Sequence, residues 1–100
     1  MFNRKKYEIE AVNLYRSANT AVLSTMSKKY EGYPFGSFIT YVTDQNRSLL
    51  MYTSNIAQHT INLKSNSKSC VTLFKLDTDY DKQNSSRLTL IGDLESVSND

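Results

Sequence analysis

The chain contains a single histidine, His59, and this side chain has the widest chemical range in the sequence. An imidazole can ligate a metal, transfer a proton or donate a hydrogen bond to an anion. His59 lies between Gln58 and Thr60 in a stretch with helical character. The alternative is a structural role, in which the ring bonds a backbone carbonyl at the start of that helix. A Ser-His-Asp triad would rest on His59 alone, and the usual zinc sites, which need several Cys or His ligands, are excluded.

The only cysteine, Cys70, is predicted to be a buried packing residue. A reactive thiolate needs a nearby cation or a helix N-terminus, and the nearest basic residue in the sequence is Lys68. A lone cysteine cannot form an internal disulfide. This pattern favours a reducing compartment, and we expect a cytoplasmic location.

Charged residues offer two further candidate sites. Arg87 can neutralise an anionic cofactor, or it can pair with an acidic loop at the surface, a contact worth only about 0–1 kcal/mol. That loop contains Asp77, Asp79 and Asp81. It superficially resembles a calcium loop, but the glycine and the terminal glutamate of an EF-hand are missing, so a solvated loop is predicted.

Length and composition indicate one globular domain over residues 1–100. Of the 100 residues, 39% are hydrophobic and 22% are charged, which are ordinary values for a folded domain. The formal net charge is only +2, so neither nucleic acid nor an anionic membrane is indicated as a partner. No apolar run approaches the ~20 residues that a membrane-spanning helix needs.

Hydrophobic spacing predicts two helices. Apolar residues recur on one helical face over residues 7–18. A second, shorter helix is predicted over residues 57–64, with Ser54 or Asn55 as its N-cap.

Runs of β-branched, aromatic and other apolar residues predict five strands. The predicted strands cover residues 21–26, 37–43, 48–54, 69–76 and 87–92, with Asp93 to Val97 as a candidate extension of the last. The second and third strands form a hairpin around a turn at 44–47, and a polar loop over 77–86 follows the fourth strand. Hairpin links favour antiparallel pairing, so the expected fold is a small, mainly β, antiparallel barrel with helices at its ends.

The sequence contains nothing after the last strand that would cover the final edge of such a barrel. A free edge is a template for unwanted pairing. We therefore expect further sequence beyond residue 100, a partner subunit, or both.

Four segments at fixed spacing carry a family resemblance. They are Gly32-Tyr33-Pro34-Phe35-Gly36-Ser37, then Tyr41 with Asp44, then Ile56-Ala57-Gln58-His59-Thr60 with Asn62-Leu63, and finally Arg87-Leu88-Thr89-Leu90-Ile91-Gly92. Together they resemble the pyridoxamine 5′-phosphate oxidase-like FMN-binding split barrels, and within that superfamily the haem-utilisation (HugZ-type) branch. The resemblance extends from Ala11 to Ser96. It implies an antiparallel split barrel that forms the N-terminal part of a longer domain.

The resemblance also implies FMN bound at the interface of a two-fold homodimer, with a small-molecule redox substrate. The site residues that it implies are Ser37, Tyr41, Ser54, Ala57, Gln58, His59 and Arg87. A helix N-terminus would offer N–H groups and a positive dipole to the phosphate. The Arg and Lys residues that hold the phosphate in the classical oxidase are replaced here, which predicts weak FMN binding or a different ligand. The resemblance places residues for pyridoxamine phosphate in the part of the family domain beyond residue 100, so that reaction is not assigned.

Three functional hypotheses remain open at this point. The first is an FMN-dependent oxidoreductase, and the second is a haem-binding or haem-degrading protein with His59 as an axial ligand. The third is a binding module on the same fold without a cofactor. Tyr41 and Tyr52 would stack on a flavin ring in the first case, or pack in the core or a dimer interface in the others.

Overall fold

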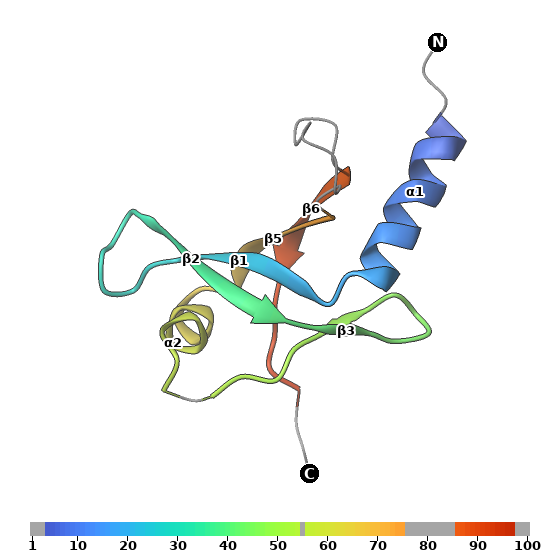
Figure 1. The fold of residues 1–100 in the computed structure, drawn as a ribbon. Helices are drawn as coiled ribbons and strands as arrows, with labels where there is room; N and C mark the ends of the chain where they lie inside the picture. The colour runs from blue at the N-terminus through green and yellow to red at the C-terminus, as the bar shows by residue number, and fades with distance from the viewer. Residues whose placement is uncertain (1–3, 55, 76–85, 98–100) are drawn as a thin grey trace.

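The computed structural model describes residues 4–54, 56–75 and 86–97 (Figure 1). Its elements are α1 (Arg4–Ser17), β1 (Thr20–Met26), β2 (Pro34–Thr40), β3 (Val42–Thr43), β4 (Leu49–Leu50), α2 (Gln58–Ser65), β5 (Lys68–Lys75) and β6 (Ser86–Asp93). Most of the predicted polar loop, with Asp77, Asp79 and Asp81, lies outside the described residues. Within the described ranges, no helix is long and apolar enough to cross a membrane.

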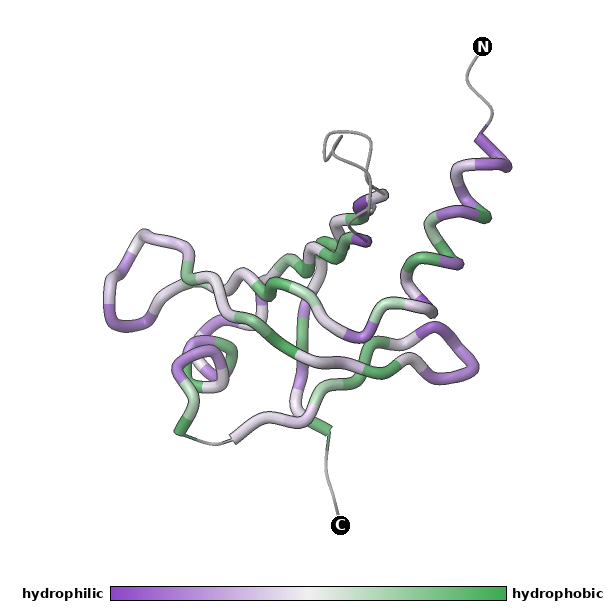
Figure 2. Tube along the Cα trace, in the orientation of Figure 1, coloured by the Kyte–Doolittle hydropathy of each residue, from purple (hydrophilic) through white to green (hydrophobic). Residues whose placement is uncertain are grey.

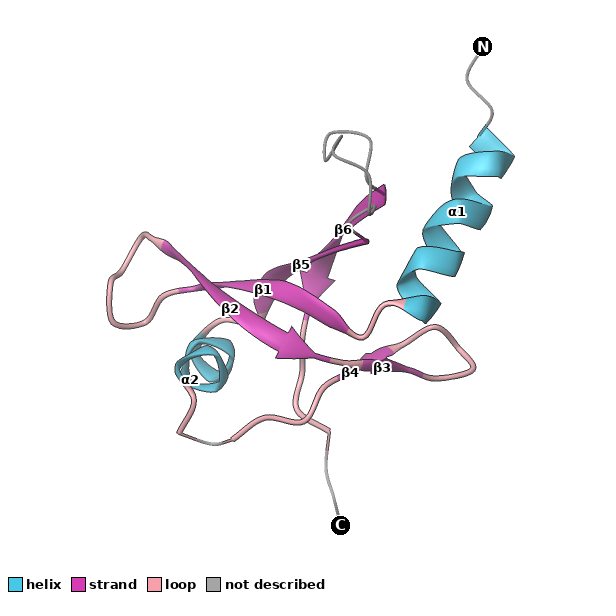
Figure 3. Cartoon of the chain, in the orientation of Figure 1, coloured by secondary structure: helices cyan, strands magenta, loops and turns pink. Residues whose placement is uncertain are grey.

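Strand β1 lies inside a four-stranded antiparallel sheet with the order β2-β1-β5-β6, and β3 and β4 form a separate two-stranded ribbon (Figure 3). The β1–β2 register runs from Thr20 opposite Thr40 to Met26 opposite Pro34. Helix α1 contacts β3, β5 and β6, whereas α2 contacts β1 and β2. The two helices therefore lie at different ends of the sheet (Figure 1). The predicted antiparallel, mainly β fold with two helices is confirmed.

The core forms on one face of the sheet because side chains alternate along each strand. On β1, Ala21, Leu23 and Thr25 are buried, whereas Val22 and Ser24 lie on the other face. Neighbouring elements complete the apolar core with Leu14, Tyr15, Ile39, Tyr41, Val71 and Leu73. Figure 2 shows the hydrophobic residues concentrated along the strands, and hydrophilic residues in the β1–β2 and β3–β4 loops.

A pair of tyrosines ties α1 to the strands. The rings of Tyr15 and Tyr41 stack with 5.9 Å between their centroids. The Tyr41 hydroxyl donates to the Tyr15 carbonyl (2.9 Å), and the Tyr15 hydroxyl donates to the Arg47 carbonyl (2.9 Å). Burial, reinforced for Tyr15 by the charge of Asp44, raises the pKa of both phenols. The pair therefore contributes to stability in its neutral form.

The second and third predicted strands differ from the structure. The second begins earlier, at Pro34, and Tyr41 separates β2 from β3. At this break the Tyr41 N–H donates to the Asn19 carbonyl (3.0 Å), while the side chain enters the core. The third predicted strand, over 48–54, is shortened to β4, because residues 51–54 do not pair as a strand.

The predicted N-cap of α2 is wrong. Ala57 holds that place and makes no side-chain capping bond. The Ser54 hydroxyl instead accepts from the N–H of Ile56 (3.3 Å), which closes a local turn before the helix begins. Asn55, the other candidate, lies outside the described residues.

Helix α1 and strand β6 also have ends that differ from the predicted ones. Helix α1 begins at Arg4, earlier than predicted, where Arg4 and Glu8 form an ion pair (3.0 Å) one turn apart. Strand β6 ends at Asp93 and does not extend to Val97. The N–H of the next residue, Leu94, donates to the Ser67 carbonyl instead (3.0 Å).

The buried tyrosines predict a loss of stability at high pH. A raised folded-state pKa means that the stabilisation is complete below the ordinary tyrosine value of 10.0 and is lost as pH rises through the folded value. We expect the free energy of unfolding, measured by urea denaturation from neutral pH to about pH 11, to decrease above pH 10.0. In the Tyr41→Phe variant the free energy of unfolding should decrease less steeply over the same range, because one of the two phenols is absent. Tyr33→Phe, at an exposed tyrosine, is the control and should follow the wild-type profile. A Tyr41→Phe profile as steep as the wild type would contradict this account.

Candidate functional site

An open cleft runs along the free edge of β2. It has a volume of about 230 Å³ and is lined by Phe38, Ile39, Thr40, Met51, Tyr52, Thr53 and His59. Three segments build it: the second half of β2, residues 51–53 after β4, and the first turn of α2. The cleft exists because residues 51–54 leave the ribbon and run beside β2 instead of extending the sheet.

His59 reaches the cleft from the first turn of α2 and is half-buried. The next residue, Thr60, donates its hydroxyl hydrogen to the Thr53 hydroxyl (2.9 Å). This bond joins the helix to the opposite wall of the cleft. The first turn of α2, which carries His59, is therefore tied to residues 51–53 by a side-chain hydrogen bond.

Asn62 anchors the other side of α2 and is completely buried, with 0% exposure. Its amide Nδ2 donates to the Thr25 hydroxyl of β1 (3.1 Å). Its Oδ1 accepts from the backbone N–H of Lys28 (3.0 Å) and from Nε2 of Gln58 (3.0 Å). We did not predict this residue as part of the site. A polar residue on a short predicted helix carries no sequence signal of burial, so only the tertiary structure reveals this role.

The structure brings together some of the predicted site residues. Ala57, Gln58 and His59 are adjacent at the start of α2, and only His59 lines the cleft. Ser54 is exposed just before this turn. Ser37 lies on β2 opposite Leu23, which places its side chain on the core side of the sheet and away from the cleft-facing Phe38.

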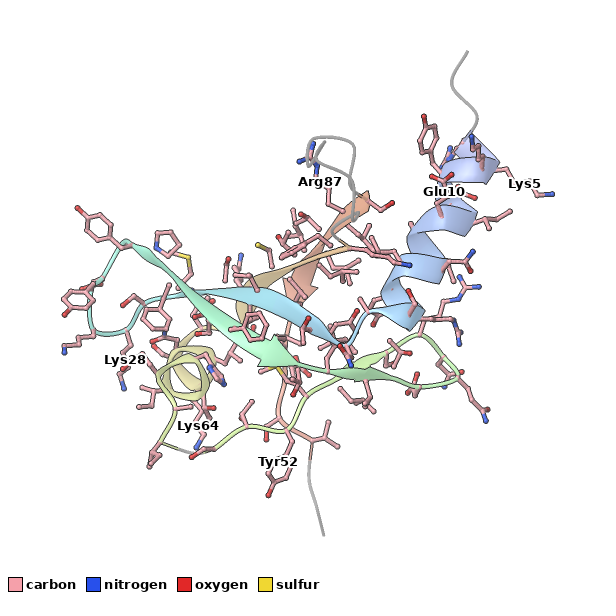
Figure 4. All side chains as sticks on the ribbon, viewed as in Figure 1. Lys5, Glu10, Lys28, Tyr52, Lys64 and Arg87 are labelled. Carbon is pink, nitrogen blue, oxygen red and sulfur yellow. The ribbon has the colours of Figure 1, made fainter. Side chains whose placement is uncertain are left out.

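Two predicted site residues lie elsewhere. Tyr41 is only 4% exposed and both its ring and its hydroxyl are engaged with Tyr15, which supports the core alternative. Arg87 is exposed on β6, at the opposite edge of the sheet from the cleft, and is far from Tyr52 (Figure 4). Neither residue lines the cleft beside His59.

Tyr52 and Cys70 complete the list of candidates. Tyr52 is 97% exposed at the cleft, so its ring is free to lie against a bound molecule. Cys70 is half-buried on β5, between Ser24 of β1 and Ile91 of β6. It lies on the face of the sheet away from the core, so the prediction of a buried packing residue holds only in part.

The side chains of the cleft suit a flat, largely apolar group better than a phosphate. Imidazole, thioether and phenol groups are all known ligands of haem iron, and the cleft offers His59, Met51 and Tyr52. Phe38 adds an aromatic wall. No residue that lines the cleft in the described part of the chain is Lys or Arg, so an FMN phosphate would lack charge-assisted bonds.

The chain thus combines a four-stranded antiparallel sheet, a separate two-stranded ribbon and a cleft at the edge of the sheet. Residues 3–100 match the family model described as "CREG, beta-barrel". The chain belongs to this CREG β-barrel family.

Several relatives are named for haem. The chain is 38% identical over 77 residues to the chloroplastic non-canonical heme oxygenase HOZ of Arabidopsis thaliana, a match that covers 77% of this chain and 23% of that protein. A heme binding protein from Mycobacterium smegmatis is 27% identical, with a TM-score of 0.79, over 91% of this chain and 36% of that one. The chain thus spans about a quarter of the plant relative's length.

Other solved structures support the fold alone. HutZ, the heme storage protein of Vibrio cholerae, is 23% identical with a TM-score of 0.71, over 92% of this chain and 66% of that one. Atu2129 of Agrobacterium tumefaciens, of unknown function, is 20% identical with a TM-score of 0.84, over 99% of this chain and 42% of that one. The split-barrel prediction is confirmed, and the names of the plant and mycobacterial relatives agree with the haem-utilisation part of the resemblance. None of these four relatives is named for a flavin.

The Asn62 contacts predict a stability effect. Asn62→Ala would leave the Lys28 N–H without its acceptor and remove the bond to Thr25. We expect the free energy of unfolding to fall by about 1–3 kcal/mol, as measured by urea denaturation. Asn13→Ala, at an exposed site on α1, is the matched control and should change it by less than about 0.5 kcal/mol. Equal losses in the two variants would count against the buried network.

Proposed function

We propose that this chain is a haem-binding split-barrel protein whose cleft beside His59 holds the porphyrin. The observation that carries the proposal is the placement of the only histidine in an open cleft beside Phe38, Met51 and Tyr52. The names of the plant and mycobacterial relatives support the choice of haem.

The cleft residues divide into two groups by the part of the haem that they suit. Phe38 and Tyr52 offer ring faces and edges to the macrocycle, and covering apolar surface favours binding. His59 offers an imidazole nitrogen to the iron, and Met51 a thioether. Bound haem would supply the redox and oxygen chemistry, while these side chains orient it and limit its contact with water.

The haem hypothesis therefore replaces FMN as the main one. What favours FMN is the start of α2, where backbone N–H groups are available to a phosphate. Against it stands the lack of a cation among the cleft residues described above. Turnover of bound haem, the activity for which the plant relative is named, is the reaction to test in the whole protein.

A hemin titration tests the proposal. We expect a Soret band to develop on addition of hemin, and His59→Ala to weaken binding by at least about tenfold, because even outer partners of a metal ligand contribute 10–100-fold to affinity. Lys64→Ala, at an exposed site near the end of the same helix, is the matched control and should bind as the wild type does. Tight binding of FMN with no Soret band would overturn the haem assignment, and a wild-type affinity in His59→Ala would remove this residue from the site.

We also propose that the protein is a homodimer that pairs through the outer face of the four-stranded sheet. Phe38 is 72% exposed and Ile91 is 87% exposed, and both lie on that face. Phe38 also lines the cleft, so the face and the cleft are continuous. A second copy on this face would cover the exposed side chains and close the open side of the cleft at once.

Sedimentation equilibrium tests the dimer. We expect the wild type to sediment as a dimer at micromolar concentration, and Ile91→Lys to shift it toward monomer because a charge would be buried in the interface. Ile9→Lys, at an exposed isoleucine of α1, is the matched control and should remain dimeric. A monomeric wild type, or equal effects of the two variants, would reject this interface.

A further inference from the structure

Helix α2 is attached to the sheet by a fully buried polar residue, Asn62, and by the partly buried Leu63, which packs against the core. Asn62 is its only fully buried residue. The helix covers eight residues, which is too short to be stable by itself. Its orientation must therefore come from tertiary contacts, and the fully buried contact is made by the side-chain amide of Asn62.

The Asn62 amide has defined partners on two elements. Its Nδ2 donates to the Thr25 hydroxyl (3.1 Å), and its Oδ1 accepts from the Lys28 N–H (3.0 Å). The Thr25 hydroxyl is then free to donate to the Phe35 carbonyl, at the longer distance of 3.5 Å. Both lone pairs of Oδ1 are used, since Gln58 donates to it as well.

Directional bonds can fix a helix in a way that apolar packing cannot. Burial of apolar surface is non-directional, so a helix held only by it can rotate or slide at small cost. A hydrogen bond weakens steeply when its geometry changes, and a single buried asparagine is known to set the register of packed helices. The bond to Thr25 is the directional contact that joins α2 to β1 in the buried part of their interface.

We propose that Asn62 is a positioning residue that places His59 in the cleft. Asn62 lies three residues after His59 and bonds Gln58, the residue just before it. Any rotation of α2 that breaks the Thr25 bond would carry the imidazole along the cleft wall. The bond between Thr60 and Thr53 restrains the same turn from the other side. The inference rests on the proposed function only where haem affinity is concerned.

A pair of Thr25 variants isolates the bond. Thr25→Val keeps the shape and β-branching of the side chain but removes the acceptor for Asn62, whereas Thr25→Ser keeps the hydroxyl. Thr20→Val makes the same change at an exposed site on the same strand and serves as the control. If Thr25→Val fails to fold, the double variant Thr25→Val with Asn62→Leu replaces the bonded pair by apolar side chains of similar shape and takes its place.

The first measurement needs no haem. Because His59 is the only histidine, the chain gives one set of imidazole signals in an NMR spectrum. We expect these signals to shift or broaden in Thr25→Val and to return to the wild-type values in Thr25→Ser, while Thr20→Val leaves them unchanged. Unchanged signals in folded Thr25→Val, or in the folded double variant where it takes its place, would overturn the inference.

The second measurement is hemin affinity, taken well below the unfolding temperature of each variant so that loss of fold does not contribute. We expect Thr25→Val to bind about tenfold more weakly, the loss typical of removing a group that orients a metal ligand. If the wild type binds no hemin, the proposed function fails, and the imidazole signals alone decide the positioning role. If the wild type binds hemin and Thr25→Val binds it equally well, the inference fails and the proposed function stands.

Discussion

The alternation of side chains along β1 is the constraint on which the rest of the structure depends. This strand pairs with β2 on one side and with β5 on the other, and it directs Ala21, Leu23 and Thr25 into the interior. Ala21 and Leu23 pack in the apolar core, to which α1 contributes Leu14 and Tyr15. Thr25 is the next residue on the same face of β1. Its hydroxyl accepts a hydrogen bond from Asn62 of α2. Strand β1 thus contributes apolar side chains to the core that α1 also joins, and a polar partner to α2.

The two contributions of β1 serve different physical purposes. The apolar core around Ala21 and Leu23 stabilises the fold through burial of hydrocarbon, which is non-directional. The polar end of β1, around Thr25, supplies geometry, because the amide of Asn62 meets its partners only at one orientation of α2. The cleft lies at this second end, beside His59. This division is consistent with a site in which a planar group must be held at a defined distance from an imidazole.

The character of the cleft, more than the presence of the histidine, separates haem from flavin. A phosphate would need cations, and the cleft residues described here provide none. A porphyrin needs flat apolar walls and a nitrogen or sulfur ligand, which Phe38, His59 and Met51 can provide. The family resemblance pointed first to FMN because FMN is the cofactor that the resemblance implies, although the Arg and Lys residues that hold its phosphate in the classical oxidase are replaced here.

The sequence by itself determined the elements whose signals are local. Hydrophobic spacing and apolar runs predicted α1, β1, β5 and β6 to within a few residues, and hydrophobic spacing predicted the start of α2 to within one residue. Only the tertiary structure decided that Tyr41 turns into the core, that residues 51–54 leave the ribbon to form a cleft wall, and that Arg87 lies at the far edge of the sheet. These outcomes depend on which strands become neighbours, and the pairing of β1 with β5 joins segments that are far apart in the chain. The role of Asn62 belongs to the same class, because a polar residue on a short helix has a buried partner only once that pairing and the path of the chain have placed Thr25 beneath it.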